Sequence, residues 1–232
     1  MTLPASTCNV SRRRRPCATG LALLLAAVFA AGCSNLKPET SPTPPTYYSL
    51  DGPGGVPATS KRATPATGYT VIVNTPQASA GVDSQRILYV RQAHKLEYFA
   101  HNEWVDPPAR MLAPLIVTAL ESTGAFRAVI SGPGSASGDL RLETEVLKLQ
   151  QEFVAKPSQV RIALRAYLAE SNSRRVVATR DFEVVQPAPS DDPYGGVQAA
   201  NVAMRTVLQQ LAAFCAETAA AWQPSRTATQ AR

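Results

Sequence analysis

The sequence predicts an α+β fold, a mostly antiparallel sheet with two amphipathic helices packed on one of its faces. Three segments in the second half of the chain, 140–153, 159–168 and 175–185, alternate apolar and polar residues, as strands with one buried face do. Two other segments, 107–123 and 194–222, repeat their apolar residues every three or four positions. That spacing is typical of helices with one buried side.

The first strands are shorter. Residues 34–68 are rich in Pro, Thr, Ser and Gly, and only 47–50 among them has the character of a strand. The β-branched run 69–73 predicts a second strand, and 86–91 and 96–99 predict a hairpin around a polar turn. We expect an edge strand, the one that begins at Tyr47 or the one that begins at Tyr69, to be open to the addition of a partner strand.

The first helix has recognisable ends. Asp106 is expected to cap it, with Pro107 at its first position and Gly124 in a left-handed conformation just after its end. Pro114 lies inside this helix and is expected to kink it or to shorten its first half. The second helix carries one apolar stripe: Val197, Ala200, Met204, Val207, Leu208, Leu211, Phe214, Cys215, Thr218 and Trp222.

The long strand from residue 140 changes phase. Its apolar residues lie on even positions up to Val146 and on odd positions from Leu147 onward, which predicts a β-bulge at this point. The next strand alternates regularly. Leu164, at its centre, is therefore expected to point into the core, and Arg165 is expected to point away from it.

The N-terminus resembles the signal peptide of a bacterial lipoprotein. Four arginines at 12–15 precede an apolar run at 18–32, and small residues lead into Cys33, which we expect to be acylated after cleavage. A secreted protein with a chance cysteine is the alternative. A transmembrane helix is disfavoured because the run is shorter than the ~20 residues needed to span a bilayer. We predict a signal peptide at 1–32, a proline-rich tether at 33–46, a single domain at 47–222 and a disordered tail at 223–232.

Charge and cysteine content exclude some classes of protein. The chain has a net charge of +6, but the four arginines at 12–15 leave with the signal, so the mature protein is close to neutral. It therefore lacks the basic footprint of a nucleic-acid-binding protein. Cys8 and Cys17 leave as well and Cys33 is acylated, so Cys215 has no partner for a disulfide within the chain.

Motifs for catalysis are missing from the sequence. The two histidines, His94 and His101, lack the spacing of metal ligands, and neither a nucleophile elbow nor a phosphate-binding loop occurs. Glu143 and Glu145 alternate on one strand face and are read as a solvated surface rather than as a catalytic pair. We predict no enzymatic activity, no metal and no cofactor.

The segment 86–112 carries a family resemblance. Its most specific part is the pattern Tyr-x-x-x-Asn-x-Trp-x-x-Pro from Tyr98 to Pro107, and together with the strand at 47–50 after a lipoprotein signal it resembles the ABC-type transport auxiliary lipoproteins. The paraquat-inducible auxiliary lipoprotein belongs to them. The resemblance implies a lipoprotein anchored in the outer membrane and facing the periplasm, the partner of a mammalian-cell-entry-domain protein and its ABC transporter in lipid transport. Ser34, rather than aspartate, follows the cysteine, which also favours the outer membrane.

Two residues near the first helix are candidate partner contacts. Trp104 is expected to act as a hydrophobic staple for that helix, with direct contact to a partner as the alternative. Arg110 is expected either to pair with Asp106 or Glu103 or to face a partner. A second class of function stays open, that of an outer-membrane assembly lipoprotein acting as a plug or chaperone for a β-barrel. Phospholipid and a second copy of the chain are further partners left open.

Overall fold

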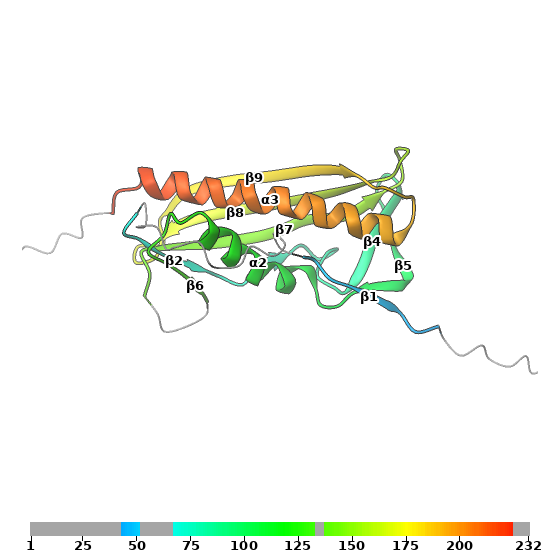
Figure 1. Cartoon of the computed structure of the whole chain (residues 1–232), viewed down its shortest axis with the longest axis horizontal. Coiled ribbons are helices and arrows are strands. Elements are labelled where there is room, and N and C mark those ends of the chain that lie inside the picture. The colour runs from blue at the N-terminus through cyan, green and yellow to red at the C-terminus, as the bar shows by residue number, and fades with distance from the viewer. Residues whose placement is uncertain (1–42, 52–66, 133–136, 225–232) are drawn as a thin grey trace, which may run out of the picture. The chain divides into compact units, whose positions relative to one another are not determined.

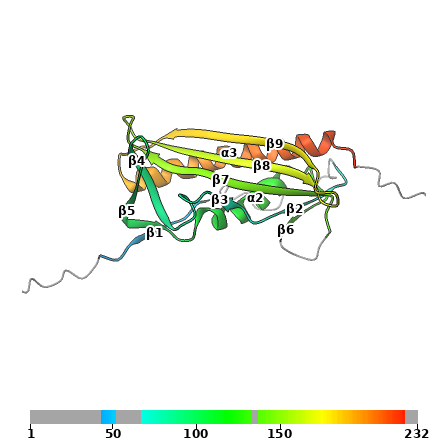
Figure 2. The same cartoon turned by 180° about the vertical axis from the view of Figure 1, so that it is seen from behind.

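The computed structural model describes residues 43–51, 67–132 and 137–224. The expected signal peptide, Cys33, most of the tether and most of the C-terminal tail lie outside these residues. The described elements, in chain order, are β1 Thr46–Tyr48, β2 Thr70–Val73, β3 Gln77–Ala78, β4 Arg86–Gln92, β5 Lys95–Trp104, α2 Pro108–Ser122, β6 Ala128–Ser131, β7 Leu140–Glu152, β8 Gln159–Glu170, β9 Val176–Pro187 and α3 Pro193–Ala221. Figures 1 and 2 show their arrangement.

The long strand β7 organises the sheet. On one side it pairs antiparallel with β8, which in turn pairs antiparallel with β9. On its other side β2, β3 and β4 follow one another along it, all parallel to β7. The longest ladders are antiparallel, so the sheet is mixed but mostly antiparallel. The predicted α+β class is confirmed.

The shorter strands extend this sheet at both ends of β7. β5 pairs antiparallel with β4 as the second strand of the predicted hairpin, and β1 adds to β5 in parallel. At the other end β6 adds to β2 in parallel. β1 has one paired side among the described residues, as expected of an edge strand. β2 lies between β6 and β7, which rules out the alternative edge at Tyr69 and leaves β1, the strand at Tyr47. The sequence could not show this because β6 was not predicted as a strand.

The predicted bulge is present in β7. Its register against β8 shifts between Val146 and Lys148, which leaves Leu147 as the extra residue. Leu142, before the bulge, and Leu149, after it, are both buried. The bulge therefore keeps the apolar residues of β7 on the core side along its whole length.

Both helices lie on the same face of the sheet, in front of it in Figure 1 and behind it in Figure 2. Asp192 caps α3 by accepting a hydrogen bond from the N–H of Gly195 at 2.7 Å. The apolar stripe of α3 is buried apart from Thr218, and it meets the buried side chains of β8, Leu164 among them. This contact between α3 and the sheet forms the main part of the hydrophobic core.

The start of α2 differs from the expectation. Pro107 occupies the N-cap position without a side-chain hydrogen bond, and Pro108 is at the start of the helix. Asp106 therefore lies one residue too early to cap it, and its carboxylate binds the guanidinium of Arg110 at 3.3 Å instead. Gly124 has a φ of 62° just after the helix, as expected. Pro114 does not shorten the helix, which runs unbroken through it.

Candidate docking surfaces

Trp104 is the last residue of β5 and belongs to the core. Its side chain is 3 % exposed, and its backbone N–H donates to the carbonyl oxygen of Gln85 at 2.6 Å. Its indole lines a small internal space with side chains of β4, β7 and β8 and with Gly196 and Ala200 of α3. Trp104 thus offers no exposed face to a partner, which agrees with a structural role. Its neighbours around this space come from the sheet and α3.

Arg110 lies on the surface of the first turn of α2. Its guanidinium pairs with Asp106 four residues earlier, one of the two carboxylates expected for it. Both side chains are well exposed, so the pair contributes little to stability. Its role as a partner contact stays a prediction.

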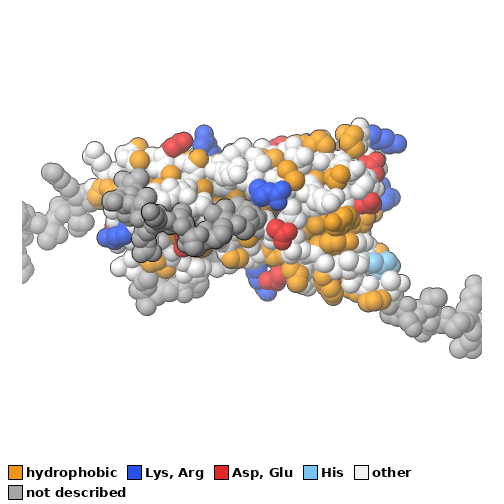
Figure 3. Space-filling view, in the orientation of Figure 1, with side chains coloured by type: hydrophobic (Ala, Val, Ile, Leu, Met, Phe, Trp, Pro, Cys, Tyr) orange, Lys and Arg blue, Asp and Glu red, His pale blue; other side chains and the backbone are white. Residues whose placement is uncertain are grey.

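A second exposed region lies where α3 begins. Figure 3 shows apolar side chains gathered at this end of the helix-bearing face. The rings of Tyr48 and Tyr194 lie 6.3 Å apart there, and Tyr194 is largely exposed. Asn201 of α3 holds the segment after β1 in place, since it accepts from the N–H of Asp51 at 2.6 Å and donates to the carbonyl of Ser49 at 3.2 Å. The edge strand β1 is therefore fixed against the helix.

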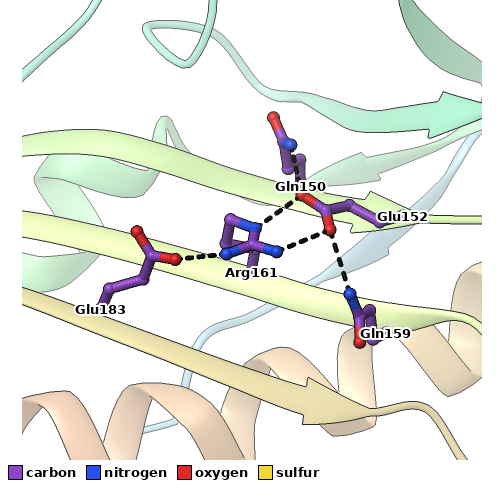
Figure 4. A network of polar contacts seen from close by, with 5 residues as sticks. All are labelled: Gln150, Glu152, Gln159, Arg161 and Glu183. Atoms are coloured by element: carbon purple, nitrogen blue, oxygen red, sulfur yellow. Dashed lines mark hydrogen bonds and ion pairs between the residues drawn. The ribbon is translucent and has the colours of Figure 1, made fainter. Parts of the chain in front are cut away.

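The opposite face of the sheet carries a network of polar side chains across three neighbouring strands. Arg161 of β8 donates to the carboxylate of Glu152 on β7 at 2.8 and 3.2 Å and also binds Glu183 on β9. Gln150 and Gln159 donate to the two oxygens of Glu152 at 2.8 and 3.2 Å. Figure 4 shows the five residues together, with Arg161 between the two carboxylates.

Partial burial makes this network different from a surface ion pair. The side chains of Arg161 and Glu152 are 26 % and 14 % exposed. Burial alone raises the pKa of the Glu152 carboxyl, but hydrogen bonds from Arg161, Gln150 and Gln159 outweigh it and hold the pKa below its ordinary value. The pKa of Arg161 is raised, chiefly by its bond to Glu152. Both groups are therefore held in their charged forms.

The network forms part of the floor of a cleft. This cleft has a volume of about 540 Å³ and lies between the β4–β5 turn and the β7–β8 connection. Leu96 on β5 and Val154 in the β7–β8 connection line it, and they are 52 % and 73 % exposed. Its remaining lining includes Val90, Ala93, His94, Lys148, Gln150, Glu152, Ala155, Gln159 and Arg161. The cleft thus combines exposed apolar walls with a charged floor.

The residues considered for catalysis lie on different elements: Glu143 and Glu145 share one face of β7, His101 lies on β5, and His94 lies between β4 and β5. His94 lies in the β4–β5 turn with a φ of 66°, and Glu143 receives a hydrogen bond from Asn74 at 3.4 Å on the outer surface. Within the described ranges, no group of three or more histidine, cysteine, aspartate or glutamate side chains could hold a metal ion. Burial raises the pKa of the Cys215 thiol to about 12, so it is not a nucleophile.

The residues 48–212 match the family described as the ABC-type transport auxiliary lipoprotein component. The chain belongs to this family. Its members are lipoproteins that are auxiliary components of transport systems. The sequence resemblance is thereby confirmed at the level of the family.

Two solved structures share this fold. A protein from Xanthomonas campestris is 26 % identical with a TM-score of 0.64, and the match covers 75 % of this chain and 96 % of that one. A further uncharacterised protein is 15 % identical with a TM-score of 0.56 and coverage of 75 % and 98 %. A lipoprotein from Neisseria meningitidis matches at 12 % identity, with a TM-score of 0.35 and coverage of 62 % and 98 %.

No curated protein matches the sequence. Among the described residues, none of the helices combines the length and the apolar character needed to cross a bilayer.

Proposed function

We propose that this protein is a non-catalytic subunit of an ABC-type system that moves lipids between two bacterial membranes. It is anchored in the outer membrane, faces the periplasm, and docks to a mammalian-cell-entry-domain protein, as the paraquat-inducible member of the family is expected to do. The observation that carries the proposal is the family match over residues 48–212. The lipoprotein signal before Cys33 supports it. The subunit works by contact, and the transporter at the inner membrane supplies the energy.

Membrane anchoring is the first part of the proposal. Cys33 would carry several acyl chains, because one chain gives only marginal membrane binding. We expect Cys33→Ser to release the protein into the soluble fraction or to leave it uncut, whereas Cys215→Ser should remain anchored because its thiol is buried. Fractionation and mass measurement test this. A Cys33→Ser protein that stays in the membrane with unchanged mass would contradict the anchor.

The outer membrane is the second part. Ser34 after the cysteine favours export from the inner membrane, and density-gradient separation of the two membranes measures where the protein resides. Recovery in the inner-membrane fraction would contradict this location, although the anchoring residue could still be correct.

Docking to a periplasmic partner is the third part. We expect the anchored protein to retain a mammalian-cell-entry-domain protein when it is purified from crosslinked cells. Retention of an outer-membrane β-barrel in its place would favour the plug or chaperone function, and the open edge of β1 would suit that function as well. Retention of neither would contradict both.

A further inference from the structure

We propose that the end of the domain that carries β1 lies against the surface of the membrane in which the chain is anchored, with Tyr47, Val105 and Tyr194 among the lipid headgroups. We call these three side chains the tyrosine edge. The inference deepens the proposed function and rests on it in one respect, namely that Cys33 carries the anchor. It identifies which surface of the domain faces the lipid.

The tyrosine edge is a continuous apolar surface around the edge strand β1. Tyr47, Val105 and Tyr194 are 56 %, 54 % and 57 % exposed. The ring of Tyr194 lies 6.3 Å from that of Tyr48, and Val105 donates its backbone N–H to the carbonyl oxygen of Tyr48 at 2.8 Å. Successive residues of a strand point to opposite faces, so Tyr47 points away from the face that Tyr48 shares with Tyr194. The two exposed tyrosines therefore flank β1 from its two sides.

The body of the domain holds β1 in a fixed position. β1 pairs with β5, and the hydroxyl of Tyr48 donates to the side-chain oxygen of Asn102 on β5 at 3.1 Å. On α3, Asn201 bonds to both Ser49 and Asp51 in the segment that follows β1. The tyrosine edge is thus ordered before it meets an occupant, which lowers the entropic cost of binding.

The position of the anchor selects a membrane as the occupant. Twelve residues, 34–45, separate Cys33 from Thr46, the first residue of β1. A fully extended chain spans at most about 3.6 Å per residue, so β1 lies no farther than about 45 Å from an anchored Cys33. A tether of this length keeps the two surfaces at a high local concentration, and weak contacts are then sufficient. A partner protein, in contrast, has to reach the same surface by diffusion.

The chemistry of the tyrosine edge suits the headgroup region of a bilayer. The ring of tyrosine is apolar, whereas its hydroxyl bonds to water, and tyrosine is therefore enriched at membrane–water interfaces. One side of β1 is unpaired among the described residues. Its N–H and C=O groups can bond to water and headgroups at this depth, but they would be unsatisfied in the hydrocarbon core. The edge is therefore expected to rest on the membrane without crossing it.

Charge next to the tyrosine edge points to a zwitterionic lipid. Asp106 and Arg110 pair at 3.3 Å, so their charges cancel. Asp51 follows β1, and Glu103 lies opposite β1 on β5 and opposite Arg86 on β4. These charges do not sum to a basic surface, which is what attracts anionic lipids. We therefore expect the contact to form on phosphatidylcholine, without a requirement for anionic lipid.

A tryptophan placed in the tyrosine edge tests the contact directly. Tyr194→Trp places an indole in the edge. Its control Val176→Trp places one at a valine that is 52 % exposed at the start of β9. The original tryptophans, Trp104 and Trp222, are buried and supply a constant background. Both substituted positions are exposed, so we expect the variants to fold, and their melting temperatures verify this.

Chemical coupling replaces natural acylation in this measurement. The mature chain is joined through the Cys33 thiol to a maleimide lipid in phosphatidylcholine vesicles, while Cys215 is buried and stays unmodified. Lipid brominated on its acyl chains quenches a nearby indole. We expect it to lower the added emission of Tyr194→Trp by about twofold or more, because apolar groups at an interface reach about 5–10 Å into the headgroup boundary. The emission of Val176→Trp should not change. Equal quenching of both indoles, or of neither, would overturn the proposal.

A second pair of variants tests whether the edge acts as a unit. In the Tyr194→Trp chain, Val105→Asp adds a carboxylate to the tyrosine edge and Val176→Asp adds one at the control position. We expect Val105→Asp to abolish the quenching and Val176→Asp to leave it unchanged. Quenching that survives Val105→Asp would overturn the edge as defined. A blue shift that grows with the number of chains per vesicle, without quenching by bromine, would assign the edge to a second copy and overturn the lipid contact.

Mass measurement of the chain purified from cells separates this inference from the proposed function. An unacylated Cys33 would refute the anchor of the proposed function, and with it the membrane contact in the cell. An acylated Cys33, together with a coupled Tyr194→Trp chain that bromine does not quench, would refute the tyrosine edge and leave the proposed function standing.

Discussion

The two faces of β8 are built from alternate residues of one strand, but one face is apolar and buried and the other carries ion-paired arginines. On the face toward the helices, Ile162, Leu164 and Leu168 are almost fully buried against the core. On the other face, Arg161 and Arg165 reach across to carboxylates on neighbouring strands. Burial of apolar area on the first face supplies most of the stability. The second face contributes less to folding because its charged side chains remain partly in water.

Substitutions on the buried face are expected to lower the free energy of unfolding the most. Leu164→Ala removes a side chain that is 1 % exposed at the centre of the contact with α3. We expect it to lower the free energy of unfolding by about 2–5 kcal/mol, through lost burial and the cavity left behind. Urea denaturation of the original chain and the variant measures this. A loss no greater than that of a substitution on the outer face would show that this face of the sheet is not the core.

An intermediate loss of stability is expected for substitutions in the partly buried part of the outer face. Arg161→Ala would leave the sheltered carboxylate of Glu152 without its main donor. We expect a loss of about 1–2 kcal/mol, smaller than for Leu164→Ala because water can reach the vacated site. Arg161→Lys is the matched control. It keeps the charge but cannot form the forked contact, so it should recover only part of the loss. Full recovery would mean that charge alone matters here.

The same network is expected to make the stability of the protein depend on pH, through the lowered pKa of Glu152. The folded-state pKa of Glu152 lies below its ordinary value of 4.5. The stability it contributes is therefore fully present above the unfolded-state pKa and is lost as the pH falls through the lower folded-state pKa. We expect Glu152→Gln to flatten this part of the decline at pH values below about 5. Urea midpoints at a series of pH values measure it, and an unchanged slope would contradict the assignment.

Local periodicity made much of this fold predictable. The alternation in β8, the spacing in α3 and the phase change at Leu147 are properties of consecutive residues, so they are visible in the sequence. The strand β3 was missed because two residues are too few to establish a period. The strand β6 was missed because it contains only two β-branched residues, Val129 and Ile130, whereas all four residues of β2 are β-branched. Asp106 was misplaced as a cap because a shift of one residue at the start of α2 does not alter the apolar stripe.

The polar network and the cleft could not be predicted in the same way. The alternation of β8, which places Arg165 on the outer face, places Arg161 there as well. Its partners Glu152 and Glu183, however, come from two other strands, and their meeting depends on the register of both ladders. The bulge in β7 changes that register by one residue. The sequence likewise left Trp104 open between two roles, because its burial depends on where the distant helix α3 lies.

The smallest loss of stability is expected for substitution of Arg165. It allows a comparison with Arg161, which forms an ion pair on the same face but is more buried. Its guanidinium makes a forked contact with the Asp181 carboxylate at 2.7 and 2.8 Å, a geometry as good as that of Arg161. The two side chains, however, are 38 % and 56 % exposed, so water and salt screen the pair. We expect the melting temperature of Arg165→Ala to remain close to that of the original chain, with the small difference disappearing in high salt. A loss as large as that of Arg161→Ala would show that contact geometry, rather than burial, determines what an ion pair contributes on this face.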